Sequence, residues 1–253
     1  MTGLGEILIN ETLKVTEEKS NSLIKRLFNK TFEETGELIA DQVRLRRYKN
    51  QITIFEKADK YLKNKNIKDI KINLKVLAPL LEYSSHEEDE NLQELWAMLI
   101  KNTLSKPTSI LMQQNSIEIL KKISNEEVTI LNYIYKNLLS DREKRSDYIN
   151  SRPRLFKTDK ISKPEDFRIE LFSYSIDGIA KKLNLGNDDL EINLSNLVAL
   201  GLLKYETEVA VKTAEKSNDD PNDMDLDIEL DILDYNKIKI TTLGFRFVEL
   251  CTQ

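Results

Sequence analysis

Two residue types that often carry catalysis, histidine and cysteine, are nearly missing from this chain, and its many carboxylates, lysines and tyrosines show no recognisable catalytic spacing. His86 is its only histidine and Cys251 its only cysteine among 253 residues. His86 lies in the run SSHEEDE, which has no HExxH spacing and is typical of a solvated helix start. Cys251 lies on an apolar helix face, where a cysteine usually acts as a small buried side chain. The phosphate-binding patterns GxGxxG and GxxxxGK followed by Ser or Thr are absent. We therefore expect a protein that is not an enzyme and binds no cofactor.

An acidic run near the C-terminus is similar to the beginning of a calcium-binding loop. Aspartates occupy its first three alternate positions, which are Asp223, Asp225 and Asp227. The sixth position of such a loop requires a glycine for its sharp turn, and here it is Ile228. The twelfth position, which supplies a bidentate glutamate, is Asp234. The pattern therefore predicts no calcium site, and we expect no metal site elsewhere.

The same run is better explained as a β-strand. From residue 224 to residue 233 apolar and acidic residues alternate, which predicts one buried face and one acidic face. A turn over 217–222 and a strand over 206–213 would complete a hairpin, and a second tight turn is expected at 235–236. We expect the acidic face to contact protein through Asp225, Asp227 and Glu229.

The C-terminal third has the element order of a winged helix-turn-helix. Helical periodicity predicts three helices before the hairpin and one after it, over residues 125–139, 175–183, 188–202 and 243–250. The third helix of such a domain enters the major groove of DNA. Here that helix opens with Asp188, Asp189 and Glu191 and contains no Lys or Arg. Because DNA phosphates repel carboxylates, we expect this module to contact protein.

A long helix with a narrow apolar seam is expected in the N-terminal part, from Phe32 to Leu62. The seam is interrupted by Asp41 and Asp59. A seam of this width packs along one partner helix, which lies either within the fold or on another subunit. The candidate contact residues on the seam are Leu38, Leu45, Tyr48, Ile52 and Phe55.

Two apolar helices are expected in the central segment. The first covers residues 72–83 and contains Pro79, which should kink it or mark its restart. The second covers residues 92–104, and Ser85 with Glu88 three residues later fits a capping box ahead of it. One face of the second helix should be core and consists of Leu92, Leu95, Trp96, Leu99 and Ile100.

The net charge of −5 conceals a strong asymmetry. Residues 42–75 contain eleven basic and three acidic residues, so this stretch carries +8 and the remaining chain −13. The stretch can bind an anionic partner, although lysine is also the ordinary solubilising residue of a sequence rich in Lys, Asn and Ile. Periodicity fades over 141–170, which we interpret as a long inserted loop. That loop carries a second basic cluster, which includes Arg152, Arg154, Lys157 and Lys160.

Three groups of motifs carry a resemblance to a known family. The first group is VLAPLLE (76–82), EEDENLQELWA (87–97), Leu99 and Asn102. The second is SIEIL (116–120) with SNEEVTIL (124–131), and the third is LVALGL (197–202) with TLGFRF (242–247). Together they resemble the abortive infection alpha (Abi-alpha) family over residues 40 to 253. The resemblance implies a bacterial phage-defence protein whose matching residues are structural, with Trp96 in the core and Pro79 at a kink. It brings no catalytic motif.

We therefore predict a mainly α protein. An N-terminal amphipathic and basic helical region (1–70) and a central helical region (71–123) precede a winged-helix domain (124–253) with an enlarged β-wing and the inserted loop. One cysteine predicts a reducing compartment. The N-terminus lacks the features of a signal peptide, and no apolar run reaches the roughly 20 residues of a membrane span. These features together predict a cytoplasmic location.

The expected function is anti-phage defence without catalysis, through self-association or contacts with other proteins. We expect a homo-oligomer whose partners are its own copies, another component of the defence system or a phage component. A DNA-binding regulator that uses the basic cluster of the inserted loop is the first alternative. A membrane-acting effector that uses the N-terminal helices is the second, and the narrow seam disfavours it.

Overall fold

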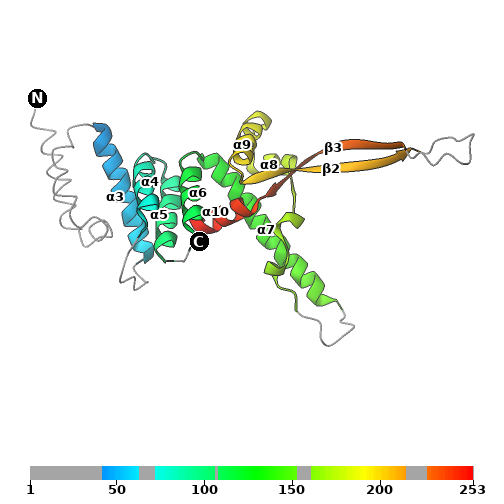
Figure 1. The fold of residues 1–253 in the computed structure, drawn as a ribbon, viewed down its shortest axis with the longest axis horizontal. Coiled ribbons are helices and arrows are strands. Elements are labelled where there is room, and N and C mark those ends of the chain that lie inside the picture. The colour runs from blue at the N-terminus through cyan, green and yellow to red at the C-terminus, as the bar shows by residue number, and fades with distance from the viewer. Residues whose placement is uncertain (1–41, 63–71, 106–107, 153–160, 215–226, 253) are drawn as a thin grey trace, which may run out of the picture. The chain divides into compact units, whose positions relative to one another are not determined.

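The computed structural model describes residues 42–62, 72–105, 108–152, 161–214 and 227–252, with the backbone alone described at 42–45, 207–214 and 227–235. The helices are α3 (Gln42–Leu62), α4 (Leu74–Ser84), α5 (Glu90–Ser105), α6 (Ile110–Leu120), α7 (Asn125–Ser151), α8 (Ile176–Leu183), α9 (Asn187–Ala199) and α10 (Thr242–Thr252). The strands are β1 (Tyr174–Ser175), β2 (Leu203–Ala214) and β3 (Asp227–Ile240). The described chain is therefore mainly helical with a small antiparallel sheet, as predicted (Figure 1). None of the described helices combines the length and the apolar character that a membrane crossing requires.

The chain divides into two compact units. Unit 1 comprises residues 1–125 and 247–253, and unit 2 comprises residues 126–246. In unit 1, α5 packs against α3 and α6, and α4 packs against the same two helices (Figure 1). The predicted core face of α5 is buried, because Leu92, Leu95, Trp96, Leu99 and Ile100 are all at most 8% exposed. Burial of these large apolar side chains is the main stabilising term of this unit.

The start of α5 differs from the prediction. Asp89 caps this helix, and its carboxylate accepts hydrogen bonds from the N–H groups of Asn91 at 2.8 Å and Leu92 at 3.0 Å. Ser85 instead follows the last residue of α4, and its hydroxyl donates to the Glu82 carbonyl at 2.6 Å. The capping box proposed for Ser85 was wrong because the helix begins after Asp89, too far from Ser85 for its side chain to reach the first turn.

Asn102 has a structural role in unit 1 that its motif did not reveal. Its side chain is fully buried, and its Nδ2 donates to the carbonyl of Leu250 at 2.6 Å. Leu250 lies in the last turn of α10, where carbonyls have no partner within the helix. The asparagine therefore satisfies a helix end that would otherwise be buried without a hydrogen bond.

In unit 2 the sheet order is β1-β3-β2, and both pairings are antiparallel. The strand β1 was not predicted from the sequence. The tight turn expected at 235–236 is wrong, because β3 continues through it as a bulge. Tyr205 lies opposite Ile238 and Thr207 opposite Asp234, so three residues of β3 face the single residue Glu206. A bulge of this kind absorbs extra residues without ending the strand.

The helix α7 is twelve residues longer than its predicted end at Leu139, since it continues to Ser151. Its added part has a polar face with four-residue spacing, formed by Arg142, Ser146 and Asn150. Arg142 donates to the carbonyl of Phe167, while Ser146 and Asn150 donate to the carbonyl of Ser162 at 2.7 and 2.8 Å. The loop expected from residue 141 thus begins only after the helix ends, two residues before Pro153.

A close contact between two Leu-Gly motifs joins the end of α9 to the start of α10. Gly201 follows α9 with a positive φ of 73°, and the N–H of Leu202 bonds to the carbonyl of Leu197 at 2.9 Å, which together form a Schellman end. The hydroxyl of Thr241 donates to the Gly201 carbonyl at 2.6 Å and accepts from the Gly244 N–H at 3.0 Å. Thr241 therefore caps α10 and holds it against the turn after α9.

Candidate functional site

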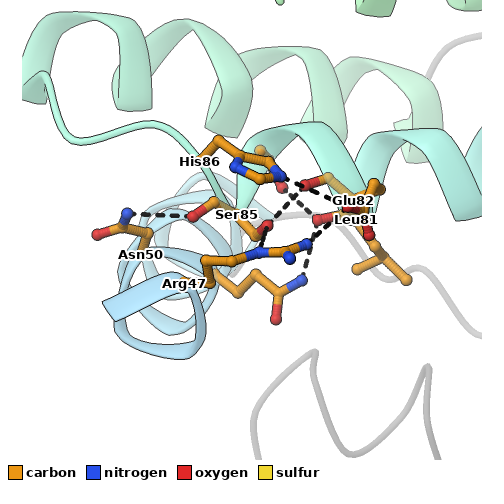
Figure 2. A network of polar contacts seen from close by, with 8 residues as sticks. Arg47, Asn50, Leu81, Glu82, Ser85 and His86 are labelled. Atoms are coloured by element: carbon orange, nitrogen blue, oxygen red, sulfur yellow. Dashed lines mark hydrogen bonds and ion pairs between the residues drawn. The ribbon is translucent and has the colours of Figure 1, made fainter. Parts of the chain in front are cut away.

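The inner side of α3 is held to the turn after α4 by polar contacts, which Figure 2 shows. Arg47 donates from Nε to the Ser85 hydroxyl at 2.9 Å and from Nη2 to the Glu82 carboxylate at 2.7 Å. Asn50, one turn later on α3, donates to the Ser85 carbonyl at 3.1 Å. These contacts come from two elements more than thirty residues apart in sequence, so they fix the rotation of α3 about its own axis.

A second group of contacts continues along the same side of α3. Gln51 donates to the Leu81 carbonyl at 2.9 Å. Lys57 pairs with Glu94 of α5 at 3.0 Å, and the Tyr61 hydroxyl donates to the same carboxylate at 2.6 Å. The hydrogen bond to Glu94 raises the pKa of Tyr61. Partial burial raises the pKa of Glu94, but the bonds from Tyr61 and Lys57 outweigh it and hold the pKa below its usual value.

The outer side of α3 presents basic residues to solvent. Arg46, Lys49, Thr53 and Lys60 are exposed, and their spacing of three, four and seven residues places them on one face of the helix. Neither Arg46 nor Lys49 makes a hydrogen bond or ion pair with any other residue that the structure describes. Arg47 and Lys57 therefore tie the fold together, Lys60 lies close enough to Glu94 to lower its pKa, and Arg46 and Lys49 are available to a partner.

The predicted seam of this helix lies mostly toward the interior of unit 1. Phe55 is only 2% exposed, so at this position the seam packs within the fold, the first of the two alternatives, and Phe55 is not free to contact another molecule. Tyr48 and Ile52 are half-buried, and burial raises the pKa of the Tyr48 hydroxyl. Leu45 lies on α3 where only the backbone is described, and Leu38 lies outside the described residues.

The solvent face of α9 is acidic and contains an exposed isoleucine. Asp188, Asp189 and Glu191 are exposed, and Ile192 beside them is 69% exposed. The opposite face of the helix is buried in unit 2 and consists of Leu190, Leu194 and Leu197. Within the described residues, no hydrogen bond or ion pair engages the three carboxylates. This face therefore offers three negative charges and an apolar side chain to solvent.

The acidic strand and the basic loop are described only in part. Asp227 and Glu229 lie in β3 opposite Ala214 and Lys212 of β2, at positions where only the backbone is described, and Asp225 lies outside the described residues. Arg152 is exposed just after α7, and its guanidinium lies 4.3 Å from the centre of the Tyr148 ring. Three further residues of that cluster lie outside the described residues, namely Arg154, Lys157 and Lys160.

The two residues singled out for their chemistry have ordinary structural environments. The Nε2 atom of His86 lies 3.4 Å from the Glu82 carboxylate at an exposed site. The hydrogen bond from His86, together with Arg47, lowers the pKa of Glu82. Cys251 is 1% exposed, and burial raises the pKa of its thiol. The raised pKa disfavours the reactive thiolate of Cys251, and the pair of His86 with Glu82 lies at an exposed site.

A family model described as abortive infection alpha matches residues 40–251, whereas comparisons with curated proteins and with solved structures returned no match. The chain belongs to the abortive infection alpha family. Membership associates the protein with abortive infection, a form of phage defence.

The motifs that suggested this family lie in the interior of each unit of the abortive infection alpha protein. Trp96 is 1% exposed and Asn102 bonds to the end of α10 in unit 1. Gly201 and Gly244 form the junction between α9 and α10 in unit 2. The exposed faces of α3 and α9 lie largely outside these motifs, so the sequence signature identifies the interior of the fold and says little about these faces.

The division of α3 into two sides predicts different effects for neighbouring arginines. We expect Arg47→Ala to lower the free energy of unfolding by about 1 kcal/mol, because it removes contacts to Ser85 and Glu82. Arg46→Ala, one residue away on the outer face, should change it by less than about 0.5 kcal/mol. Urea unfolding followed by the fluorescence of Trp96, the only tryptophan, measures both. Equal effects of the two variants would contradict this assignment.

Proposed function

We propose that this abortive infection alpha protein acts by binding protein, through self-association and through contacts with another defence or phage component, and not by catalysis. We also infer that unit 2 is a winged helix whose third helix, α9, has become a docking surface for polypeptide. The observation that carries the proposal is the exposed face of α9, which has three carboxylates, an exposed Ile192 and no basic residue.

The order of elements supports the winged-helix assignment. Unit 2 runs through α7, β1, α8, α9, β2, β3 and the start of α10, with β1 added to the hairpin as a third strand. In winged helices the third helix is the one that reads DNA, and the hairpin forms the wing. The extended hairpin of β2 and β3 carries Asp227 and Glu229, which we propose as a second contact surface with protein.

Electrostatics favours protein over nucleic acid as the partner of α9. Carboxylates in the first turn of a helix stabilise it through the helix dipole, and this effect alone can explain Asp188 and Asp189. The dipole does not account for an isoleucine that is 69% exposed on the same face. Apolar side chains surrounded by charge are typical of protein interfaces, whereas a DNA-reading helix needs Lys or Arg to offset phosphate repulsion.

Ser85, His86 and Cys251 have structural environments, which supports a role without catalysis. Ser85 donates its hydroxyl proton to a backbone carbonyl, and His86 lies beside a carboxylate at the surface instead of beside that hydroxyl. The Cys251 thiol is buried and its pKa is raised. A nucleophile needs a base within hydrogen-bond reach or a lowered pKa, and neither group has one.

Substitution of Ile192 tests the proposal in cells that carry the protein and are challenged with phage. We expect Ile192→Asp to remove most of the protection, because it places a further charge in the middle of the docking face. The matched control is Leu171→Asp in the same unit, where an apolar residue that is 57% exposed lies outside α9. Both changes are on the surface and should leave the thermal midpoint nearly unchanged.

The competing function, a DNA-binding regulator, makes an opposite prediction. If wild-type protein binds duplex DNA with a strong dependence on salt, and Arg152→Glu abolishes that binding, the regulator replaces our proposal. Full protection by Ile192→Asp together with loss of protection by Leu171→Asp would also overturn the assignment of α9.

A further inference from the structure

The outer face of α3 is a basic surface whose neighbours in the described chain leave it uncovered. The inner cations of this helix are engaged, since Arg47 pairs with Glu82 and Lys57 with Glu94. Arg46 and Lys49 are exposed and form no ion pair with a described residue. This face presents two adjacent positive charges at its N-terminal end, with the partly exposed Glu56 and the exposed Lys60 further along it.

We propose that the outer face of α3 docks a second copy of this chain, whose α9 places Asp188 and Glu191 against Arg46 and Lys49. The proposal rests on the self-association in the proposed function and names the surfaces that would carry it. Both surfaces belong to the same polypeptide, so any solution of the protein contains them in equal number.

The spacing of the charges on the two helices is the same. Arg46 and Lys49 are three residues apart on α3, and Asp188 and Glu191 are three residues apart on α9. Residues at this spacing lie on one face of a helix, with their Cβ atoms about 5–6 Å apart. Two helices that cross at these positions can therefore form two ion pairs at once, which adds orientation to the attraction between opposite charges.

The exposed isoleucine supplies an apolar contact beside the ion pairs. Ile192 directly follows Glu191 and is 69% exposed. The aliphatic stems of lysine and arginine cover apolar surface while their charged ends reach solvent or a carboxylate. Burying Ile192 against the stems of Arg46 and Lys49 would remove apolar area from water at the centre of the contact.

A second copy fits the α3 face better than a membrane or a single strand of nucleic acid. Membrane binding needs an apolar face. The exposed stripe of α3 consists of Arg46, Lys49, Lys60 and the polar Thr53, so it has no apolar residue. Single-stranded nucleic acid is usually held by aromatic side chains that stack on its bases, and the exposed stripe of Arg46, Lys49, Thr53 and Lys60 contains none. Charge complementarity with α9 is therefore the more specific match.

An interface between two different surfaces of one chain is either reciprocal, in a two-fold dimer, or heterologous, so that each copy binds one neighbour through α3 and another through α9. The heterologous arrangement closes into rings or continues as filaments. The assembly should weaken as salt concentration rises, because exposed ion pairs are screened.

Charge reversal with rescue by mixing tests the proposal. Variant A is Arg46→Glu with Lys49→Glu, and variant B is Asp188→Lys with Glu191→Lys. Light scattering coupled to size exclusion, on nuclease-treated protein at low salt, should give the wild type a mass above the 29.4 kDa of one chain. Each variant alone should elute at the mass of one chain, because its two surfaces then carry the same sign. An equal mixture should regain the wild-type mass, because the reversed α3 of A is complementary to the reversed α9 of B.

The possible outcomes separate this inference from the proposed function. Rescue in the mixture supports the inference and also excludes unfolding as the reason that single variants fail. A wild type that is a single chain, variants that remain assembled, or a mixture that stays dissociated would each overturn it. Assembly of wild type that disappears after nuclease treatment would assign the α3 face to nucleic acid instead. The proposed role of α9 in defence is tested separately, by phage protection of cells that carry Ile192→Asp, and full protection would contradict it.

Discussion

Replacing Gly244 with alanine will destabilise unit 2 by about 3 kcal/mol or more. A Cβ atom at this position would lie 2.2 Å from the carbonyl oxygen of Leu202 and 3.0 Å from its carbonyl carbon. Both atoms belong to the backbone, so they cannot move aside as the end of a flexible side chain could. The Leu202 carbonyl also accepts the N–H of Thr241 at 2.9 Å, and moving it would strain the cap of α10.

Thermal unfolding followed by circular dichroism measures this effect. For a unit of this size, a loss of about 3 kcal/mol lowers the midpoint by roughly 10 °C or more. The matched control is Gly178→Ala in α8, where the nearest atoms to a new Cβ lie at 3.5 and 3.8 Å, an ordinary contact. Alanine is favoured over glycine in helices by up to about 1 kcal/mol, so the control should be neutral or slightly stabilising. A Gly244→Ala protein as stable as the control would contradict the close approach of α10 to the turn at Leu202.

The same junction shows what the sequence could and could not reveal. The motifs LVALGL and TLGFRF were visible as family resemblances, and each predicted the end or start of a helix. Nothing in either motif stated that the two would meet, since they are about forty residues apart. Gly201 needs its positive φ to end α9, whereas Gly244 is in a helix and needs only the absence of a side chain. The two glycines are alike in sequence but serve different physical requirements.

Helices with an apolar face were predictable, and the part of a helix that the sequence did not predict, the second half of α7, lacks one. Helix α5 was found because five large apolar residues recur at helical spacing. The second half of α7 was read as loop because its spaced residues, Arg142, Ser146 and Asn150, are polar. Their partners are backbone groups of the segment that returns along the helix. Hydrophobic periodicity cannot detect a helix that is held in this way.

Errors in the hairpin and in the capping of α5 have a shared origin. Tyr235 and Asn236 satisfied a local pattern for a turn, and Ser85 with Glu88 satisfied a local pattern for a cap. In the structure the strand continues as a bulge, and Asp89 is the residue that caps the helix. Each local pattern is compatible with more than one structure. At Tyr235 and Asn236, the pairing of β3 with two neighbouring strands favours a continuous strand over a turn.

The candidate surfaces were predictable to different degrees. The acidic face of α9 could be predicted from the sequence, because a helix at the DNA-reading position that contains carboxylates and no Lys or Arg is unusual. The division of α3 into an inner and an outer set of cations could not, because Arg46 and Arg47 are equivalent until the position of α4 is known. The predicted seam identified the buried side of α3 at Phe55, and the exposed side follows only from the packing of α3 against α4 and α5.

Loss of Trp96 should have the largest effect on unit 1. Trp96 is 1% exposed on α5, the helix that packs against both α3 and α6. Replacement by alanine removes its transfer free energy and leaves a cavity, which together cost about 3–5 kcal/mol in comparable buried sites. A protein domain has only about 5–15 kcal/mol of total stability, so Trp96→Ala should leave this unit close to unfolding.

Cys251 provides the measurement, because it is the only thiol and is 1% exposed within the same unit. When unfolding is fast relative to labelling, the rate of modification by a thiol reagent follows the population of the open state. A loss of 3–5 kcal/mol should therefore raise the labelling rate by about 10²- to 10⁴-fold. Met98→Ala on the same helix, where the side chain is only half-buried, should raise it by less than about tenfold. Comparable labelling rates in the two variants would mean that α5 does not organise the core around Trp96.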